Sequence, residues 1–356
     1  MPPISIMIKP ASSLCNMRCE YCFYHSLAEN RESFSYGLLK EELFLDIIKK
    51  AFEFTKGQAV NISFQGGEPL LRGRAFFRIA IEIANQENKY KSPINYGLQT
   101  NGLLIDDEWC EFFKTNNFLI GLSLDGNEKA NEKRRDSNLE PTFSRIIAGA
   151  NLLKKHKVDF NILAVVTPYV AKNIRKIYPF FTQNGFKHLQ FIPCLSPLNG
   201  EKSKNTVTSK EYGDFLIDLF RMYLFDFRRG DYTSIRQLDN FVQLAHRRKA
   251  EQCGMNGHCT HQFVIEGDGE VYPCDFYCTD EYRLGNIKDT DFTALSSHPI
   301  AIKFIKESLL LPAKCKSCKY FMLCQGGCKR ERLDIDKCEG YKRFFALALP
   351  HLKKMS

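Results

Sequence analysis

The chain has 356 residues, of which 44% are hydrophobic and 26% charged, a length that suits a main domain with a smaller one appended. Its formal net charge is +9, but no stripe of aromatic residues is interleaved with the basic ones, so we expect no nucleic acid partner. No stretch approaches the roughly 18 uncharged apolar residues of a membrane span, and the N-terminus lacks the basic lead-in of a signal peptide, so we expect a cytoplasmic protein with no membrane partner.

Six short apolar runs in the first two-thirds of the chain predict β-strands, and helical-length segments follow each of the first five. Such repetition predicts a parallel sheet with right-handed crossovers. Six units fall short of the eight that close a TIM barrel, so we predict an α/β fold with an open, partial (βα)6 TIM-like barrel whose chemistry lies at the carboxyl ends of its strands. The predicted strands span residues 4–9, 60–65, 94–99, 118–124, 160–166 and 189–193, and the predicted helices 40–55, 74–88, 106–116, 142–156 and 174–184.

The pattern changes after residue 198. Residues 199–208 are polar and predict a surface loop, and helical spacing returns at 211–229 and 238–248. From Cys253 the chain is rich in cysteine and glycine, and it contains one predicted hairpin, in which strands 262–266 and 270–273 flank a Gly-Asp-Gly turn. We therefore predict two domains: residues 1–235 form the barrel with a bridging helix, and residues 236–356 form a small Cys-rich domain that bound metal has to organise.

Fourteen cysteines in a chain without an export signal indicate metal ligands rather than disulfides. The first group, Cys15, Cys19 and Cys22, follows the first predicted strand in the segment Cys-Asn-Met-Arg-Cys-Glu-Tyr-Cys. Three thiolates this close can hold three irons of a [4Fe-4S] cluster and leave the fourth iron open to a chelating ligand. A zinc site is the weaker interpretation, because structural zinc takes four ligands and this loop supplies three.

The second group contains eight cysteines in the last third of the chain. Eight thiols are enough for two fully ligated [4Fe-4S] clusters, and two structural zinc sites would use the same number. Spacing alone does not choose between these interpretations. The eight are Cys253, Cys259, Cys274, Cys315, Cys318, Cys324, Cys328 and Cys338.

The first motif, with its aromatic residue at Tyr21, resembles the hallmark of the radical S-adenosylmethionine (SAM) superfamily. The resemblance implies that the methionine amine and carboxylate of SAM bind the open iron, and that SAM is cleaved to a 5′-deoxyadenosyl radical that abstracts hydrogen. Later segments match in order, with GGEP, QTNG and SLDG at the ends of the second, third and fourth predicted strands. Glycine would let the backbone approach the SAM amino group, and Glu68 would offset its charge. The implied SAM contacts are Tyr21, Tyr24, Gln65, Gly66, Gly67, Glu68, Ser123, Arg134 and Leu195.

The second cysteine group resembles the SPASM domain, which is found behind radical SAM domains that modify peptides, and this favours iron–sulfur over zinc. The resemblance implies three [4Fe-4S] clusters in all. We expect the remaining cysteines, Cys110, Cys194 and Cys278, to pack in the core. The implied ligands are Cys253, Cys259, Cys274 and Cys328 for the first auxiliary cluster, and Cys315, Cys318, Cys324 and Cys338 for the second.

The fullest resemblance is to the anaerobic sulfatase-maturating enzymes, along strings such as MIKPASSLCNMRCEYCFYHSL and CGMNGHCTHQFVIEGDGEVYPCDFY. That family oxidises a cysteine or serine of a partner sulfatase to Cα-formylglycine, through abstraction of a Cβ hydrogen by the 5′-deoxyadenosyl radical. The resemblance implies that Asp275 is the general base and that the auxiliary clusters are the electron exit. Two departures are peripheral to this chemistry: only nine residues separate Cys328 from Cys338, and Ala130 stands where a histidine is expected.

The implied partner is a sulfatase polypeptide with a Cys/Ser-x-Pro/Ala-x-Arg motif, and we expect the chain itself to be a monomer. Basic residues at 228–229, 247–249 and 353–354 indicate either solvated helix faces or a docking surface for a small acidic electron donor protein. The main alternative function is another SPASM enzyme, one that crosslinks or epimerises a ribosomally made peptide. A non-catalytic zinc or electron-transfer protein is a further alternative, against which the open-iron motif and GGEP argue.

Overall fold

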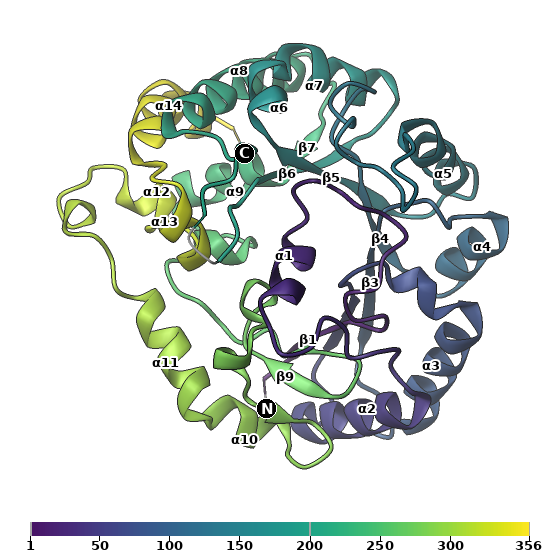
Figure 1. Ribbon diagram of the computed structural model, residues 1–356. Helices are drawn as coiled ribbons and strands as arrows, with labels where there is room; N and C mark the ends of the chain where they lie inside the picture. Colours follow the sequence, from purple (N-terminus) through teal and green to yellow (C-terminus); the bar gives the residue numbers. More distant parts are fainter. Residues whose placement is uncertain (1, 199–200, 356) are drawn as a thin grey trace. The chain divides into compact units, whose positions relative to one another are not determined.

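The computed structural model describes residues 2–198 and 201–355 (Figure 1). The chain divides into two compact units, each built from several segments. The first unit comprises Met1–Ser123, Arg134–Phe160 and His261–Phe304, and the second comprises Leu124–Lys133, Asn161–Thr260 and Ile305–Ser356. The two units are described separately below.

The first unit is built on a sheet in which four parallel strands lie in chain order. They are β1 (Ile4–Ile8), β2 (Val60–Phe64), β3 (Ile94–Thr100) and β4 (Leu119–Ser123). The other edge of β1 pairs in parallel with β8 (Val264–Ile265), which continues antiparallel into β9 (Glu270–Tyr272) and β10 (Gly285–Asn286). The hairpin predicted around Gly-Asp-Gly is therefore present, with shorter strands than predicted.

Helices cover the outer face of these parallel strands (Figure 1). The four long ones are α2 (Glu41–Thr55), α3 (Arg74–Glu87), α4 (Asp107–Thr115) and α5 (Phe143–Lys155). Phe44 on α2, Phe64 on β2 and Phe77 on α3 are almost completely buried in the layer between sheet and helices, and each such ring contributes about 1.5–3 kcal/mol of stability. The rest of the unit contains α1 (Phe23–Glu29), α10 (Phe292–Ser297) and the short 3-10 turns η1 (Pro69–Arg72), η3 (Asp275–Tyr277) and η4 (Asp280–Tyr282).

The second unit contains three parallel strands, β5 (Phe160–Val166), β6 (His188–Pro193) and β7 (Ser234–Ile235). Around them lie α6 (Pro168–Lys172), α7 (Ile174–Gln183), α8 (Ser209–Arg228) and α9 (Arg236–Ala245). Its C-terminal part holds η2 (Cys253–Met255), η5 (Ala313–Cys315), α12 (Phe321–Cys324), α13 (Lys329–Asp334) and α14 (Cys338–Leu352). The remaining helix, α11 (Pro299–Ser308), runs from one unit into the other.

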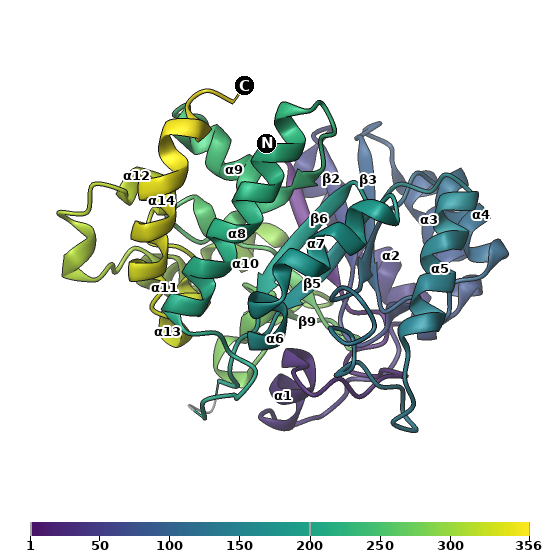
Figure 2. The same ribbon diagram turned by 90° about the horizontal axis from the view of Figure 1, so that it is seen from above.

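A close helix pair, α8 and α14, gives the second unit much of its core, and the two lie side by side in both views (Figures 1 and 2). Their backbones approach at two glycines: a Cβ added to Gly213 would lie 2.5 Å from the Cα of Gly340. Phe220 on α8 packs edge-on against Phe344 on α14, with ring centroids 5.7 Å apart. Thr208 begins α8 with a capping box completed by Glu211.

The six predicted barrel strands and their five helices are confirmed, with ends that agree to within about two residues. The helix predicted at 238–248 was displaced, because α9 ends at Ala245 and Arg247 has a left-handed φ of 59°. The helices of the C-terminal part, α14 above all, were not predicted. Part of the predicted loop 199–208 lies outside the described residues, and the boundary predicted at residues 235 and 236 stays a prediction. No helix in the described ranges is long and apolar enough to cross a membrane.

Candidate functional site

The first cysteine loop lies between β1 and α1, and the GGEP turn after β2 holds its beginning in place. The Gly67 N–H donates to the Ser12 carbonyl and the Glu68 N–H donates to the Leu14 carbonyl, both at 2.8 Å. The approach is so close that a Cβ on Gly67 would lie 2.0 Å from the Leu14 carbonyl oxygen. Gly66 combines a φ of 118° with a Cβ position 2.8 Å from the Ser12 carbonyl oxygen. The two glycines are therefore required by the cysteine loop itself, a role that the sequence analysis did not identify.

The three thiols of this loop fit an iron–sulfur cluster by their chemistry. All are free of disulfides, and the negative charges of Cys22 and Cys19 act on Cys15, so they lie near one another. Burial raises the pKa of Cys15 to about 12, and a thiol in such a place ionises only when cationic charge such as iron is bound. Within residues 2–198 and 201–355, no three potential ligands meet closely enough to hold a single metal ion, as expected if these thiolates surround a cluster of several irons.

Glu68 is completely buried at the ends of β2 and β3. Its carboxylate accepts hydrogen bonds from the backbone N–H groups of Leu70 at 3.0 Å and Asn101 at 2.8 Å, and from the Thr100 hydroxyl at 2.9 Å. Burial raises its pKa to about 7. The carboxylate therefore ties the GGEP turn to the segment QTNG, which explains why the two motifs occur together.

Other predicted SAM contacts lie at the same edge of the first unit's sheet. Arg134 is almost completely buried, and its guanidinium lies 5.5 Å from the centroid of the Tyr21 ring, within the range of a cation–π contact. Its charge also lowers the pKa of Cys22, which burial raises. Ser123 ends β4 and is buried. Leu195 belongs to the second unit, where it follows β6 and is half-buried.

Asp275 lies on η3, directly after Cys274, and is 5% exposed. Its Oδ2 accepts hydrogen bonds from the Tyr24 hydroxyl at 2.5 Å and the Gln65 side-chain amide at 3.3 Å. Its Oδ1 lies 3.5 Å from the Lys9 ammonium but accepts no hydrogen bond from any described residue. Burial raises the pKa of Asp275, and Lys9 opposes that rise. The structure thus gathers three residues that the sequence analysis had singled out, with one buried acceptor atom left over.

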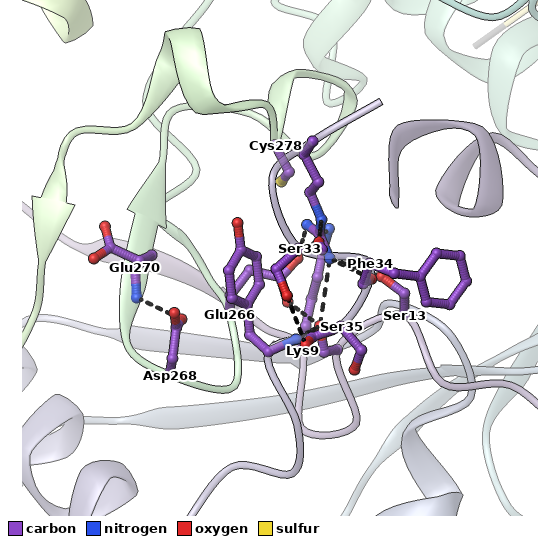
Figure 3. A network of polar contacts seen from close by, with 12 residues as sticks. Lys9, Ser13, Ser33, Phe34, Ser35, Glu266, Asp268, Glu270 and Cys278 are labelled. Carbon is purple, nitrogen blue, oxygen red and sulfur yellow. Dashed lines mark hydrogen bonds and ion pairs between the residues drawn. The ribbon is translucent and has the colours of Figure 1, made fainter. Parts of the chain in front are cut away.

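Lys9 belongs to a buried network of charges that the sequence analysis missed (Figure 3). Its ammonium lies 3.4 Å from Glu266, whose carboxylate also pairs with Arg31 at 2.7 Å and accepts from the Ser12 hydroxyl at 2.8 Å. Two cations thereby face two carboxylates, which satisfies the condition for burying charge. The available signal was the position of Lys9 and Glu266, both charged residues at the carboxyl ends of apolar strands.

Four thiols of the second unit border one cavity of about 230 Å³. Cys315, Cys324, Cys328 and Cys338 line it, together with Tyr341 and others. Burial raises the pKa of Cys324, and the charges of Cys318 and Cys315 raise it further. The cavity and its sulfur-rich wall therefore fit a bound cluster.

The remaining predicted ligands fall in both units. In the second unit, the charge of Cys259 acts on both Cys253 and Cys328, so these three thiols are neighbours. Cys274 belongs to the first unit and is half-buried. The three cysteines predicted to pack in the core are indeed buried, and burial raises the pKa of each to about 12: Cys110, Cys194 and Cys278.

Comparison with known proteins extends these observations. Residues 10–178 match the radical SAM superfamily and residues 253–319 match the SPASM iron–sulfur cluster-binding domain. The chain is 45% identical to a cysteine-type anaerobic sulfatase-maturating enzyme of Clostridium perfringens (strain 13 / Type A), over 99% of this chain and 98% of the relative. It is 28% identical to a serine-type enzyme of Bacteroides thetaiotaomicron, over 99% of this chain and 91% of the relative.

A solved structure, native anSMEcpe with bound AdoMet and Cp18Cys peptide, matches with a TM-score of 0.94 and 43% identity, over 99% of this chain and 98% of that one. Likeness at this level confirms the predicted fold class, in which the partial barrel of a radical SAM domain is followed by a SPASM domain.

Proposed function

Because this chain belongs to the anaerobic sulfatase-maturating enzymes, which are radical SAM enzymes, we propose that it oxidises a cysteine or serine of a partner sulfatase to Cα-formylglycine. The observation that carries this proposal is the buried carboxylate of Asp275. It lies next to Cys274, and its partners Tyr24 and Gln65 lie next to the first cysteine loop and the GGEP turn in the sequence. A proton acceptor is thereby connected directly to the cofactor-binding segments.

The oxidation removes a hydrogen atom from Cβ, a proton from the side-chain thiol or hydroxyl, and one electron, which leaves a double bond at Cβ. When bound, the cluster and SAM would supply the radical that takes the hydrogen atom. Cys15, Cys19 and Cys22 would hold that cluster. The residues proposed to contact SAM are Tyr21, Tyr24, Gln65, Gly66, Gly67, Glu68, Ser123, Arg134 and Leu195.

Asp275 is the proposed general base. Tyr24 and Gln65 occupy its Oδ2, so Oδ1 is the atom available to the proton of the substrate. The Lys9 ammonium at 3.5 Å favours the ionised carboxylate that a base requires. Burial excludes water that would otherwise compete for the same oxygen.

Two further clusters complete the proposal, which brings the total to three. The cavity of about 230 Å³ supports the second auxiliary site, since its wall carries thiols from η5, α12 and α14. The proposed ligand sets are Cys253, Cys259, Cys274 and Cys328 for the first auxiliary cluster, and Cys315, Cys318, Cys324 and Cys338 for the second.

The proposed substrate is a sulfatase segment of the Cys/Ser-x-Pro/Ala-x-Arg type. The higher identity to the cysteine-type relative, 45% against 28%, favours cysteine as the target. We further propose a monomer that works in the cytoplasm with a small acidic electron carrier. Crosslinking or epimerisation of a ribosomally made peptide would need no aldehyde product, so product analysis separates it from the main proposal.

The test is anaerobic turnover of the iron- and sulfide-reconstituted protein with SAM, a reductant and a peptide containing Cys-x-Pro-x-Arg. We expect the peptide to lose the mass of its thiol and gain that of an aldehyde, with one 5′-deoxyadenosine formed per event. Asp275→Asn should abolish the aldehyde, whereas the exposed Asp231→Asn should leave it unchanged. Deoxyadenosine without any change in this peptide would contradict sulfatase maturation and move the activity to another peptide.

A further inference from the structure

A basic cavity in the second unit is separate from every residue assigned to SAM or to the general base. Its volume is about 470 Å³, and it lies where the chain leaves α9 and approaches Cys253. Its wall includes Arg247, Arg248, Lys249, His258, Met322 and Cys253. No acidic side chain is among the described residues that line it.

The cations at this cavity are exposed and poorly neutralised. Within the described ranges, Arg247 and Lys249 form no ion pair, and Arg248 reaches only the Gln243 side chain, at 3.5 Å. Other exposed cations of the same unit do pair: Arg175 binds Asp218 at 2.7 Å. Three adjacent positive charges repel one another, so an arrangement that leaves them together favours an anionic partner.

The segment that carries these charges is held firmly. The Asn240 side-chain oxygen accepts hydrogen bonds from the backbone N–H groups of Glu251, at 2.6 Å, and Gln252, at 3.1 Å. His246 bonds the Met355 carbonyl oxygen at 2.6 Å. The cations therefore project from a backbone fixed on both sides, which reduces the entropy lost when a partner docks.

An apolar contact lies among the charges. Met322 is 65% exposed on α12 and lines the same cavity as the buried Leu244. A flexible, polarizable methionine surrounded by cations suits a transient protein interface better than a site for a small inorganic anion.

The position of Cys253 connects this surface to the proposed chemistry, and here the inference rests on the proposed function. Cys253 is exposed at the cavity and is a proposed ligand of the first auxiliary cluster. In the proposed reaction, the hydrogen atom and the proton leave the substrate with one electron still to be removed. That electron must leave the enzyme, and it reduces a one-electron carrier by one unit.

We propose that Arg247, Arg248 and Lys249, with Met322 at their centre, form the docking surface for an acidic one-electron carrier protein. The second basic pair considered from the sequence does not share this surface. Arg228 reaches His351 at 3.5 Å and Arg229 lies over the Phe225 ring, and neither lines the cavity. The pair at 228 and 229 is thus a matched control.

The experiment measures binding of an acidic flavodoxin to the reconstituted holoenzyme by calorimetry at low and high salt. The test variant is Arg247→Glu/Arg248→Glu/Lys249→Glu, and the control is Arg228→Glu/Arg229→Glu. We expect the test variant to weaken binding by about tenfold or more and to remove most of its salt dependence. The control should stay within about twofold of the unmodified enzyme. Iron content and circular dichroism verify that both variants are folded and loaded.

Equal effects of the two variants, or none from either, would overturn the proposal. So would an unchanged flavodoxin affinity with a raised KM for the sulfatase peptide, because the surface would then belong to the substrate. Aldehyde formation with a chemical reductant is measured in the same preparations and should not change in the test variant. Absence of aldehyde from the unmodified enzyme would defeat the proposed function, whereas the binding result is read without turnover.

Discussion

Replacing Gly67 by alanine should disrupt the beginning of the first cysteine loop. The added Cβ would lie 2.0 Å from the Leu14 carbonyl oxygen, 2.6 Å from its carbonyl carbon and 2.7 Å from the Ser13 carbonyl carbon. All three are backbone atoms, so no side-chain rotation relieves the overlap. The chain must separate, which breaks the hydrogen bonds that Gly67 and Glu68 donate to the loop. At about 1–3 kcal/mol for each buried group left unsatisfied, the loss of unfolding free energy is about 2–6 kcal/mol.

Anaerobic urea unfolding followed by circular dichroism measures this loss, and iron content measures its effect on the cluster. We expect Gly67→Ala to unfold at lower urea and to bind less iron, because its loop carries one proposed cluster. Gly97→Ala is the matched control, since a Cβ there meets its nearest atom at 3.8 Å and has an ordinary backbone. If Gly67→Ala retained the stability and iron content of Gly97→Ala, the close approach that we describe would not determine the loop.

Three other substitutions test separate parts of the structure. Lys9→Met removes one cation from a buried quartet and should cost about 3–5 kcal/mol of unfolding free energy, measured by urea unfolding against a methionine at an exposed lysine. Gly213→Ala should separate α8 from α14 and lower stability by about 1–3 kcal/mol, seen as a lower thermal midpoint. Asp107 has a pKa held below its usual range by hydrogen bonds from Lys155 and His156. Its stabilising effect is therefore complete above roughly pH 4 and lost as the pH falls through the lowered pKa, so Asp107→Asn should flatten the acid dependence of stability.

The barrel was predictable because its signals are local in the sequence. The strands from β1 to β6 are short apolar runs, and a segment with helical spacing follows each of the first five, so position along the chain is enough to identify them. The helix α14 was missed although Phe344, Phe345, Ala348 and Leu352 form a buried stripe on it. Two cysteine motifs nearby favoured an interpretation in which metal alone organises the region, and packing against α8 was not considered.

The candidate site was predictable only in part, for a similar reason. The cysteines and the GGEP turn are recognisable within eight or fewer residues, whereas Lys9 and Glu266 are joined by folding across more than two hundred residues. A lysine at the end of an apolar strand reads equally well as a solvated end of that strand. Only the pairing of β1 with β8 brings its ammonium beside both carboxylates.

That pairing also explains how the first unit can keep a carboxylate ready in a buried place. An isolated buried aspartate would take up a proton, because desolvation penalises its charge. Here Lys9 faces Asp275 and Glu266 together, and Arg31 supplies a second cation to Glu266. The four charges sum to zero without help from solvent. The Gly-Asp-Gly hairpin therefore contributes to the chemistry of Asp275 through the strand that precedes it, by fixing Glu266 where it orients Lys9.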